Sequence, residues 1–122
     1  LINDNVYLPG YIPDEELQGM YQNALLSVYP SLYEGFGLPP LESMTYGCPT
    51  INSDITALRE ISGNAALYAD PYDVEDITMK INQLLKDDRL RNELQMKGLE
   101  QVEKYSWEKS AKQVLELVER YI

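Results

Sequence analysis

The sequence of 122 residues contains no histidine and a single cysteine, Cys48. Without histidine, a histidine metal ligand, a histidine general base and a catalytic triad of the usual kind are all excluded. One cysteine cannot form an internal disulfide, which excludes a small disulfide-stabilised fold. No apolar run approaches the roughly 20 residues that a membrane-spanning helix needs. Any chemistry must therefore rest on carboxylates, hydroxyls and the backbone.

Positive charge is scarce over most of the chain. Residues 1–79 contain twelve acidic side chains and one basic side chain, Arg59, whereas residues 80–122 contain nine basic and eight acidic ones. The formal net charge is −10. Because proteins bind duplex nucleic acids through clustered cations, this distribution argues against a nucleic-acid partner.

The remaining composition is typical of one globular domain. Hydrophobic residues make up 44% of the chain and charged residues 25%, and a chain of this size buries roughly two thirds of its unfolded surface. We find no repeat, low-complexity segment or linker, so residues 1–122 are expected to form a single, partial domain. The chain begins with Leu1 rather than Met and lacks a signal-peptide pattern, which predicts a piece of a longer, cytoplasmic protein.

Short apolar runs alternate with segments of helical period, and this pattern predicts an α/β fold in which a parallel sheet is joined by crossover helices. Strands are expected at 6–8, 25–29, 48–53 and 66–69. Helices are expected at 14–24, 39–47 and 57–61, with an all-helical tail over about 73–122.

Several of the predicted helices have an apolar stripe, among them the first and the last, whose stripes we expect to be buried. The stripe of the first helix comprises Leu17, Met20, Tyr21 and Ala24. The stripe of the last helix, for which Ser106 is the expected N-cap, comprises Trp107, Ala111, Val114, Leu115, Val118 and Tyr121. Trp107 is expected to anchor the core, and Cys48 to be a buried packing thiol.

The segment from Tyr29 to Gly47 carries the most information about function. It joins a buried strand to a helix through a loop with glycines at positions 35 and 37. Glycine lets the backbone approach a ligand, and the N–H groups and dipole of the helix N-terminus attract an anion. This combination predicts a phosphate-binding site at the carboxyl edge of the sheet.

Glu34 in this loop and Glu42 in the helix are placed to surround one ligand there. A carboxylate is a poor phosphate ligand but a good acceptor for sugar hydroxyls. Two of them beside a phosphate site indicate a sugar phosphate or a nucleotide sugar. Taken singly, each feature has a simpler explanation: a tight turn for the glycines, a favourable helix dipole for Glu42 and a solvated loop charge for Glu34.

The two glutamates are separated by seven residues, and EGFGLPPLE resembles the Glu, seven residues, Glu motif of the family 4 retaining glycosyltransferases. The similarity extends over residues 8–121. Its further segments are GYIPDEEL at 10–17, YPS at 29–31, ESMTYGCP at 42–49, EI at 60–61, GNAA at 63–66, DP at 70–71 and YSW at 105–107.

The resemblance implies a B-type glycosyltransferase architecture, in which two Rossmann-like domains face each other across a cleft. This chain would be most of the C-terminal, donor-binding domain, and the N-terminal, acceptor-binding domain would lie outside it. The full-length protein would transfer a sugar from a nucleotide-sugar to an acceptor hydroxyl on a glycan or lipid-linked acceptor. We expect this piece alone to be inactive, and any association with the inner membrane face to depend on other parts of the protein.

The resemblance also implies roles for individual residues. Glu34 would hold hydroxyls of the donor sugar near the reacting anomeric carbon, and Glu42 would hold the ribose hydroxyls. The loop at Gly35 and the backbone N–H groups of Phe36, Gly37 and Leu38 would contact the sugar and the distal phosphate, and the backbone around Tyr11 and Ile12 would border the nucleobase. No metal or other cofactor is expected. Basic side chains from an upstream Arg and Lys would balance the diphosphate charge.

Two other functions remain open from the sequence. One is a phosphorylase or a sugar-nucleotide epimerase on the same architecture, and the other is a non-catalytic module that binds a nucleotide. Among the ten tyrosines, Tyr33 and Tyr46 are the candidates for the cleft, whereas Tyr7, Tyr21, Tyr29 and Tyr68 are expected at core positions.

Overall fold

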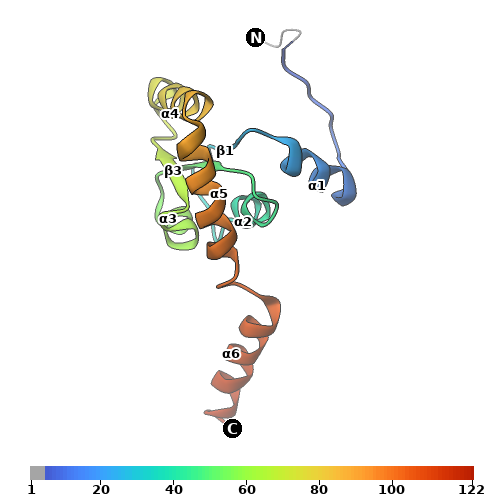
Figure 1. Ribbon diagram of the computed structural model, residues 1–122. Helices are drawn as coiled ribbons and strands as arrows, with labels where there is room; N and C mark the ends of the chain where they lie inside the picture. The colour runs from blue at the N-terminus through green and yellow to red at the C-terminus, as the bar shows by residue number, and fades with distance from the viewer. Residues whose placement is uncertain (1–4) are drawn as a thin grey trace.

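The computed structural model describes residues 5–122. A parallel sheet of three strands, in the order β1-β2-β3, lies at its centre (Figure 1). The strands are β1 (Ser27–Tyr29), β2 (Thr50–Ser53) and β3 (Ala66–Ala69). The helices are α1 (Asp14–Asn23), α2 (Leu38–Thr45), α3 (Thr56–Ser62), α4 (Val74–Lys86), α5 (Asp88–Val102) and α6 (Trp107–Glu119). The predicted α/β class is confirmed.

Successive side chains of a strand point to opposite faces, and both faces of this sheet are covered. On one face, Tyr29 and Tyr68 contact a cluster formed mainly by α2 and α3. On the other face, Val28 and Ile51 lie against α4 and the first half of α5. Helix α5 packs closely against α2. A Cβ at Gly98 of α5 would lie 3.1 Å from Met44 Cγ on α2.

Most element boundaries agree with the sequence. Strand β3 has the expected bounds, and α2, α3, α4 and α6 begin within two residues of the positions that the pattern indicates. Ser106 caps α6 as predicted, because its hydroxyl accepts a hydrogen bond from the N–H of Lys109 at 3.1 Å. Cys48 is buried, and this burial raises the pKa of its thiol. Strands β1 and β2 are two residues shorter at their start than expected.

The strand predicted at 6–8 is wrong. These residues have no regular structure, and the side chains of Tyr7 and Leu8 are 82% and 68% exposed. An isolated apolar triplet becomes a strand only when a neighbour supplies its ladder hydrogen bonds, and within residues 5–122 the sheet has three strands, none of them from this segment. The core position predicted for Tyr7 is wrong for the same reason.

Helix α1 forms as predicted but does not bury its apolar stripe. None of its residues is buried, and Met20 is 49% exposed. The helix stands to one side of the sheet (Figure 1), and its Tyr21 ring stacks on the ring of Tyr46, the residue that follows α2. Two residues of the stripe, Leu17 and Tyr21, line a hollow rather than a core.

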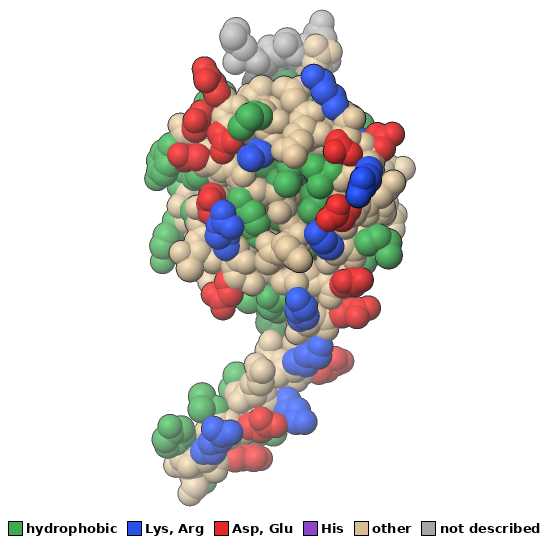
Figure 2. All heavy atoms as spheres, turned by 60° about the vertical axis from the view of Figure 1, so that its left-hand side comes forward, with side chains coloured by type: hydrophobic (Ala, Val, Ile, Leu, Met, Phe, Trp, Pro, Cys, Tyr) green, Lys and Arg blue, Asp and Glu red, His purple; other side chains and the backbone are tan. Residues whose placement is uncertain are grey.

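Helix α6 also leaves its apolar stripe exposed. It projects away from the sheet after the turn at residues 103–106 (Figure 1), and Trp107 is 82% exposed. Side chains of both charge signs and hydrophobic side chains alternate along this projecting segment (Figure 2). The expectation that Trp107 anchors the core is wrong, because none of the other described elements reaches the stripe over most of its length.

Leu58 is the side chain whose truncation best tests this core. It lies on α3, is 0% exposed and belongs to the buried cluster shared with α2, and replacing it by alanine is expected to lower the free energy of unfolding by about 2–5 kcal/mol. Equilibrium urea unfolding measures this change. Leu85→Ala is the matched control, because Leu85 is 46% exposed on α4 and its truncation should cost much less. Equal losses in the two variants would contradict this description of the core.

Candidate functional site

A buried glycine fixes the loop between β1 and α2. Gly37 is the N-cap of α2 and has a φ of 106°, a region that glycine adopts easily and other residues rarely. A Cβ at this position would lie 2.5 Å from Leu58 Cδ2 and 2.8 Å from Ile61 Cδ1. Gly35 differs, because no heavy atom lies within 4 Å of the place where its Cβ would be. The loop is thus tightly held at Gly37 and open at Gly35.

The first turn of α2 offers fewer backbone donors than an ordinary helix N-terminus. The helix begins with Leu38, Pro39 and Pro40, and proline has no N–H. From the N-cap to the third helical residue, only Gly37 and Leu38 can therefore donate to an anion. This end of α2 can contact a phosphate through two amides, with the remaining charge to be balanced by other groups.

Glu34 lies in this loop and is half-buried. Its Oε1 atom accepts a hydrogen bond from the Tyr29 hydroxyl at 2.7 Å and one from the Ser31 hydroxyl at 2.7 Å. These bonds, the one from Ser31 first, hold the pKa of Glu34 below its ordinary value. The residue lines a hollow of about 400 Å³ between the loops that follow β1 and β2, and we call this space the Glu34 hollow. Its other lining residues are Leu32, Tyr33, Asp54, Ile55, Thr56 and Ala57.

Glu42 lies on α2 and is exposed. It lines a second space of about 210 Å³ between α1 and α2, the Glu42 hollow. Tyr21 and Tyr46 form one wall, with ring centroids 6.2 Å apart and an interplanar angle of 11°. Burial, followed by the charge of Glu42, raises the pKa of Tyr21. The Glu42 hollow thus combines a carboxylate with flat aromatic surface.

The two carboxylates do not share one hollow, although the sequence places them around one ligand. Both carboxylates act on the hydroxyl of Tyr29. The pKa of Tyr29 is raised to about 12, first by its hydrogen bond to Glu34, then by burial, and then by the negative charges of Glu34 and Glu42. Both carboxylates therefore lie within electrostatic range of one hydroxyl at the carboxyl end of β1. A ligand that reaches both hollows must extend across this end of the sheet.

Phe36 and Leu38 border a third, more apolar space of about 190 Å³ beside the start of α6. The Phe36 ring meets the Tyr105 ring edge-on, with centroids 5.9 Å apart. This contact ties the loop to the junction between α5 and α6. The side chains of Phe36 and Leu38 thus line a different space from the two glutamates' hollows, and a role in ligand binding there would fall to their backbone.

Tyr11 and Ile12 lie before α1, beyond the lining of the Glu42 hollow. Tyr11 is 90% exposed and Ile12 half-buried. The first residue of this region that lines the hollow is Asp14. Their proposed contact with a nucleobase stays a prediction. Tyr33 and Tyr46, the two tyrosines expected at a cleft, line the Glu34 and Glu42 hollows respectively.

Arg59, the single basic residue of positions 1–79, already has partners. Its Nη2 donates to Asp54 Oδ2 at 2.7 Å, its Nε donates to Asp54 Oδ1, and its guanidinium lies 4.4 Å from the centroid of the Tyr68 ring. The hydrogen bond from Arg59 holds the pKa of Asp54 below its ordinary value. A diphosphate at this site would therefore need cations from elsewhere in the protein.

No group of three or more His, Cys, Asp or Glu side chains within residues 5–122 is arranged to hold a metal ion. The helices in this part of the chain also include none that is long and apolar enough to cross a membrane. The expectations of a metal-free reaction and of a cytoplasmic location stay predictions.

The sequence does not reveal the partners of Glu34. Tyr29 is expected at a core position, and its ring does contact the core, but its hydroxyl bonds the carboxylate. Ser31 does not belong to a sequence pattern that would identify it as a partner of Glu34. The available signal is weak: two hydroxyl residues stand five and three positions before a candidate carboxylate, in a loop that begins at a proline.

The fold and the site define the class of protein. A Rossmann-like parallel sheet with flanking helices carries a glycine loop and two carboxylates near its carboxyl edge, which is the architecture of one half of a B-type glycosyltransferase. The solved structure of a sucrose-phosphate synthase from Thermosynechococcus elongatus matches 97% of this chain and 30% of its own, with a TM-score of 0.86 and 32% identity.

The sequence profile described as "Glycosyl transferases group 1" matches residues 1–101. The chain belongs to this family, and its resemblance to the family 4 glycosyltransferases is confirmed. An O-antigen chain mannosyltransferase B of Escherichia coli is 47% identical over 106 residues, which are 87% of this chain and 28% of that protein. A mannosylfructose-phosphate synthase of Agrobacterium fabrum is 38% identical over 121 residues, which are 97% of this chain and 27% of that protein. The chain thus spans less than a third of these relatives.

Proposed function

We propose that the full-length protein transfers a sugar from a nucleotide-sugar to an acceptor hydroxyl with retention of the anomeric configuration, and that this chain binds the donor. The observation that carries the proposal is the pair of hollows beside the β1–α2 loop, each lined by one glutamate. The family membership and the sugar-transferring relatives support it. The acceptor, a glycan or a lipid-linked sugar, would be held by another part of the protein.

In this proposal, the donor lies across the carboxyl end of β1. The sugar occupies the Glu34 hollow, where one carboxylate accepts hydrogen bonds from sugar hydroxyls. The ribose lies at the Glu42 hollow, where Glu42 accepts from its vicinal hydroxyls. The diphosphate between them meets the amides of Gly37 and Leu38 at the start of α2.

The charge of the leaving group needs a further contribution. Two negative charges develop or persist on a departing nucleoside diphosphate, and α2 supplies two first-turn amides where an ordinary helix offers more. Arg59 is held by Asp54. We therefore propose that basic side chains outside residues 1–79 stabilise the diphosphate, and that this chain on its own does not catalyse transfer.

The binding role of Glu42 is tested by Glu42→Gln in the full-length protein. Loss of a charged hydrogen-bond acceptor for the ribose is expected to weaken binding of the nucleoside diphosphate by about 1–3 kcal/mol. Isothermal titration calorimetry measures this change. Glu100→Gln, an exposed position on α5, is the matched control and should leave binding unchanged. Equal affinity in wild type and Glu42→Gln would count against the role.

The reaction type is tested by identifying the products formed from each nucleotide-sugar. Transfer releases a nucleoside diphosphate and joins the sugar to an acceptor, phosphorolysis consumes inorganic phosphate, and epimerisation changes the sugar itself. A module without catalysis would bind the nucleotide and form no product.

A further inference from the structure

The two hydrogen bonds to Glu34 converge on the same atom. Both hydroxyls donate to Oε1, each at 2.7 Å, and within the described part of the chain no donor bonds Oε2. A carboxylate oxygen that accepts two such bonds has little capacity left for a third strong one. Oε2 is therefore the oxygen that remains available to a ligand in the Glu34 hollow.

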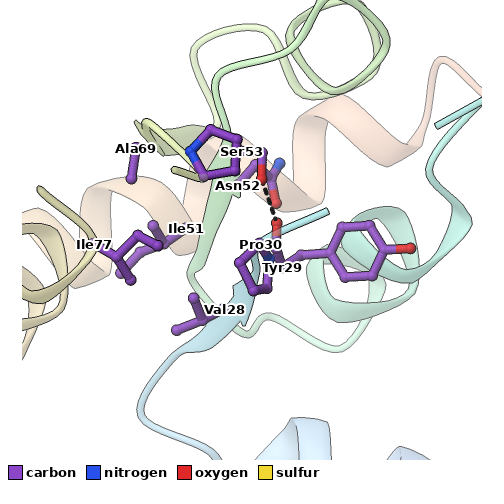
Figure 3. A pocket seen from close by; sticks show the side chains of 9 residues that line it. Val28, Tyr29, Pro30, Ile51, Asn52, Ser53, Ala69 and Ile77 are labelled. Atoms are coloured by element: carbon purple, nitrogen blue, oxygen red, sulfur yellow. Dashed lines mark hydrogen bonds between the residues drawn. The ribbon is translucent and has the colours of Figure 1, made fainter. Parts of the chain in front are cut away.

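The two donors differ in how firmly they are held. Tyr29 is the last residue of β1, and its ring packs against the core cluster on the α2 side of the sheet. Its carbonyl oxygen accepts a hydrogen bond from Ser53 Oγ at 3.3 Å, and its ring points away from Val28, Ile51 and Ile77 (Figure 3). Its hydroxyl is thus a donor on a fixed strand. Ser31 is the second donor and lies in the loop itself; its hydroxyl is also 3.0 Å from the Tyr33 carbonyl oxygen, but the carboxylate oxygen at 2.7 Å is the nearer and charged acceptor for its one proton.

The protonation state of the Tyr29 hydroxyl also suits it to donate a hydrogen bond to Glu34. The hydrogen bond to Glu34 is the first cause of a Tyr29 pKa of about 12, so the hydroxyl keeps its proton at neutral pH. The same two bonds favour the ionised form of Glu34, whose pKa is lowered. A charged acceptor with a proton donor fixed on one oxygen loses little freedom when a ligand reaches the other oxygen.

We propose that Tyr29 and Ser31 are positioning residues for donor transfer: they clamp Oε1 of Glu34 and thereby present Oε2 to the hydroxyls of the donor sugar. The inference rests on the proposed function, in which Glu34 contacts the sugar. Neither hydroxyl touches the donor in this arrangement. Their effect on turnover passes entirely through the carboxylate, and this property distinguishes the clamp from a merely structural contact.

The test is steady-state kinetics of the full-length protein carrying Tyr29→Phe, Ser31→Ala or both. Loss of one charge-assisted hydrogen bond is expected to lower kcat about tenfold, with a smaller change in KM for the nucleotide-sugar, and loss of both to lower kcat further. Ser31→Thr keeps a hydroxyl and should restore most of the activity lost in Ser31→Ala. Tyr68→Phe is the matched control, because its hydroxyl bonds the carbonyl of Gly63 at 2.6 Å rather than Glu34, and its kcat should stay near that of the wild type.

The same substitutions in a Glu34→Ala background complete the experiment. If the clamp acts through Glu34, Tyr29→Phe and Ser31→Ala should have almost no further effect on kcat there. Equal losses in both backgrounds, or wild-type kcat in the double variant while Glu34→Ala is impaired, would overturn the clamp and leave the proposed function standing. Full turnover in Glu34→Ala would overturn the proposed contact with the sugar and the clamp together.

Discussion

Replacing Glu34 by alanine should lower turnover of the full-length protein about a hundredfold or more, the scale of losing a preorganised electrostatic contact. In the proposed reaction, positive charge builds at the anomeric carbon of the donor as the leaving group departs. A carboxylate held beside the sugar stabilises that state more than the ground state, and only such a difference accelerates the step. The loss should therefore fall mainly on kcat rather than on KM for the donor.

Steady-state kinetics with a thermal melt of each variant measures this effect. Glu100→Ala removes a carboxylate from an exposed position on α5 and should leave kcat unchanged. A folded Glu34→Ala variant with near-normal turnover would show that Glu34 is only a solvated loop charge.

Gly37→Ala should lower the free energy of unfolding by about 2–5 kcal/mol, because it adds backbone strain to a steric clash. The φ of 106° at this position disfavours any residue with a Cβ, and the new atom would lie 2.5 Å from Leu58 Cδ2. Leu58 cannot move away easily, since it is fully buried. The loop that carries Glu34 would lose its fixed path into α2.

Gly35→Ala is the matched control for this substitution. No heavy atom lies within 4 Å of the position of its Cβ, and its φ is not in the positive region. Urea unfolding should therefore give a nearly wild-type stability for Gly35→Ala and a clear loss for Gly37→Ala. Equal stabilities in the two variants would contradict the close passage of the loop over α3.

The sheet and its helices could be predicted because their signals are local. Ala66–Ala69 is a short apolar run between a glycine turn and Asp70-Pro71, and β3 has these bounds. Ser106 precedes a periodic segment and caps α6 through its side chain, as predicted. Each of these features depends on residues close together in the sequence.

The errors concern burial, which depends on what lies opposite a segment. The apolar stripes of α1 and α6 have the period of buried helices, yet Met20 and Trp107 are 49% and 82% exposed. The triplet at 6–8 has strand-forming residues but no strand beside it. A hydrophobic period predicts the shape of an element, and it carries no information on which neighbour covers that element.

The candidate site likewise has features that the sequence predicted and features that it could not predict. The spacing of Glu34 and Glu42 placed both beside the β1–α2 loop, where the structure has them. Their separation into two hollows could not be predicted, since it depends on where α1 and the loop after β2 lie in space. The joint approach of Tyr29 and Ser31 to one oxygen of Glu34 depends on side-chain rotamers and on the path of the loop.

Hydrogen–deuterium exchange of the full-length protein, with and without saturating nucleoside diphosphate, tests the central claim most directly. The uridine, guanosine and adenosine forms are tried separately, and binding is established by calorimetry. We expect the one that binds to slow amide exchange in peptides covering residues 31–46, which hold Glu34, the α2 N-terminus and Glu42. Binding that protects only other parts of the protein, or no binding of any nucleoside diphosphate by the folded protein, would contradict the assignment of this chain as the donor-binding part of a glycosyltransferase.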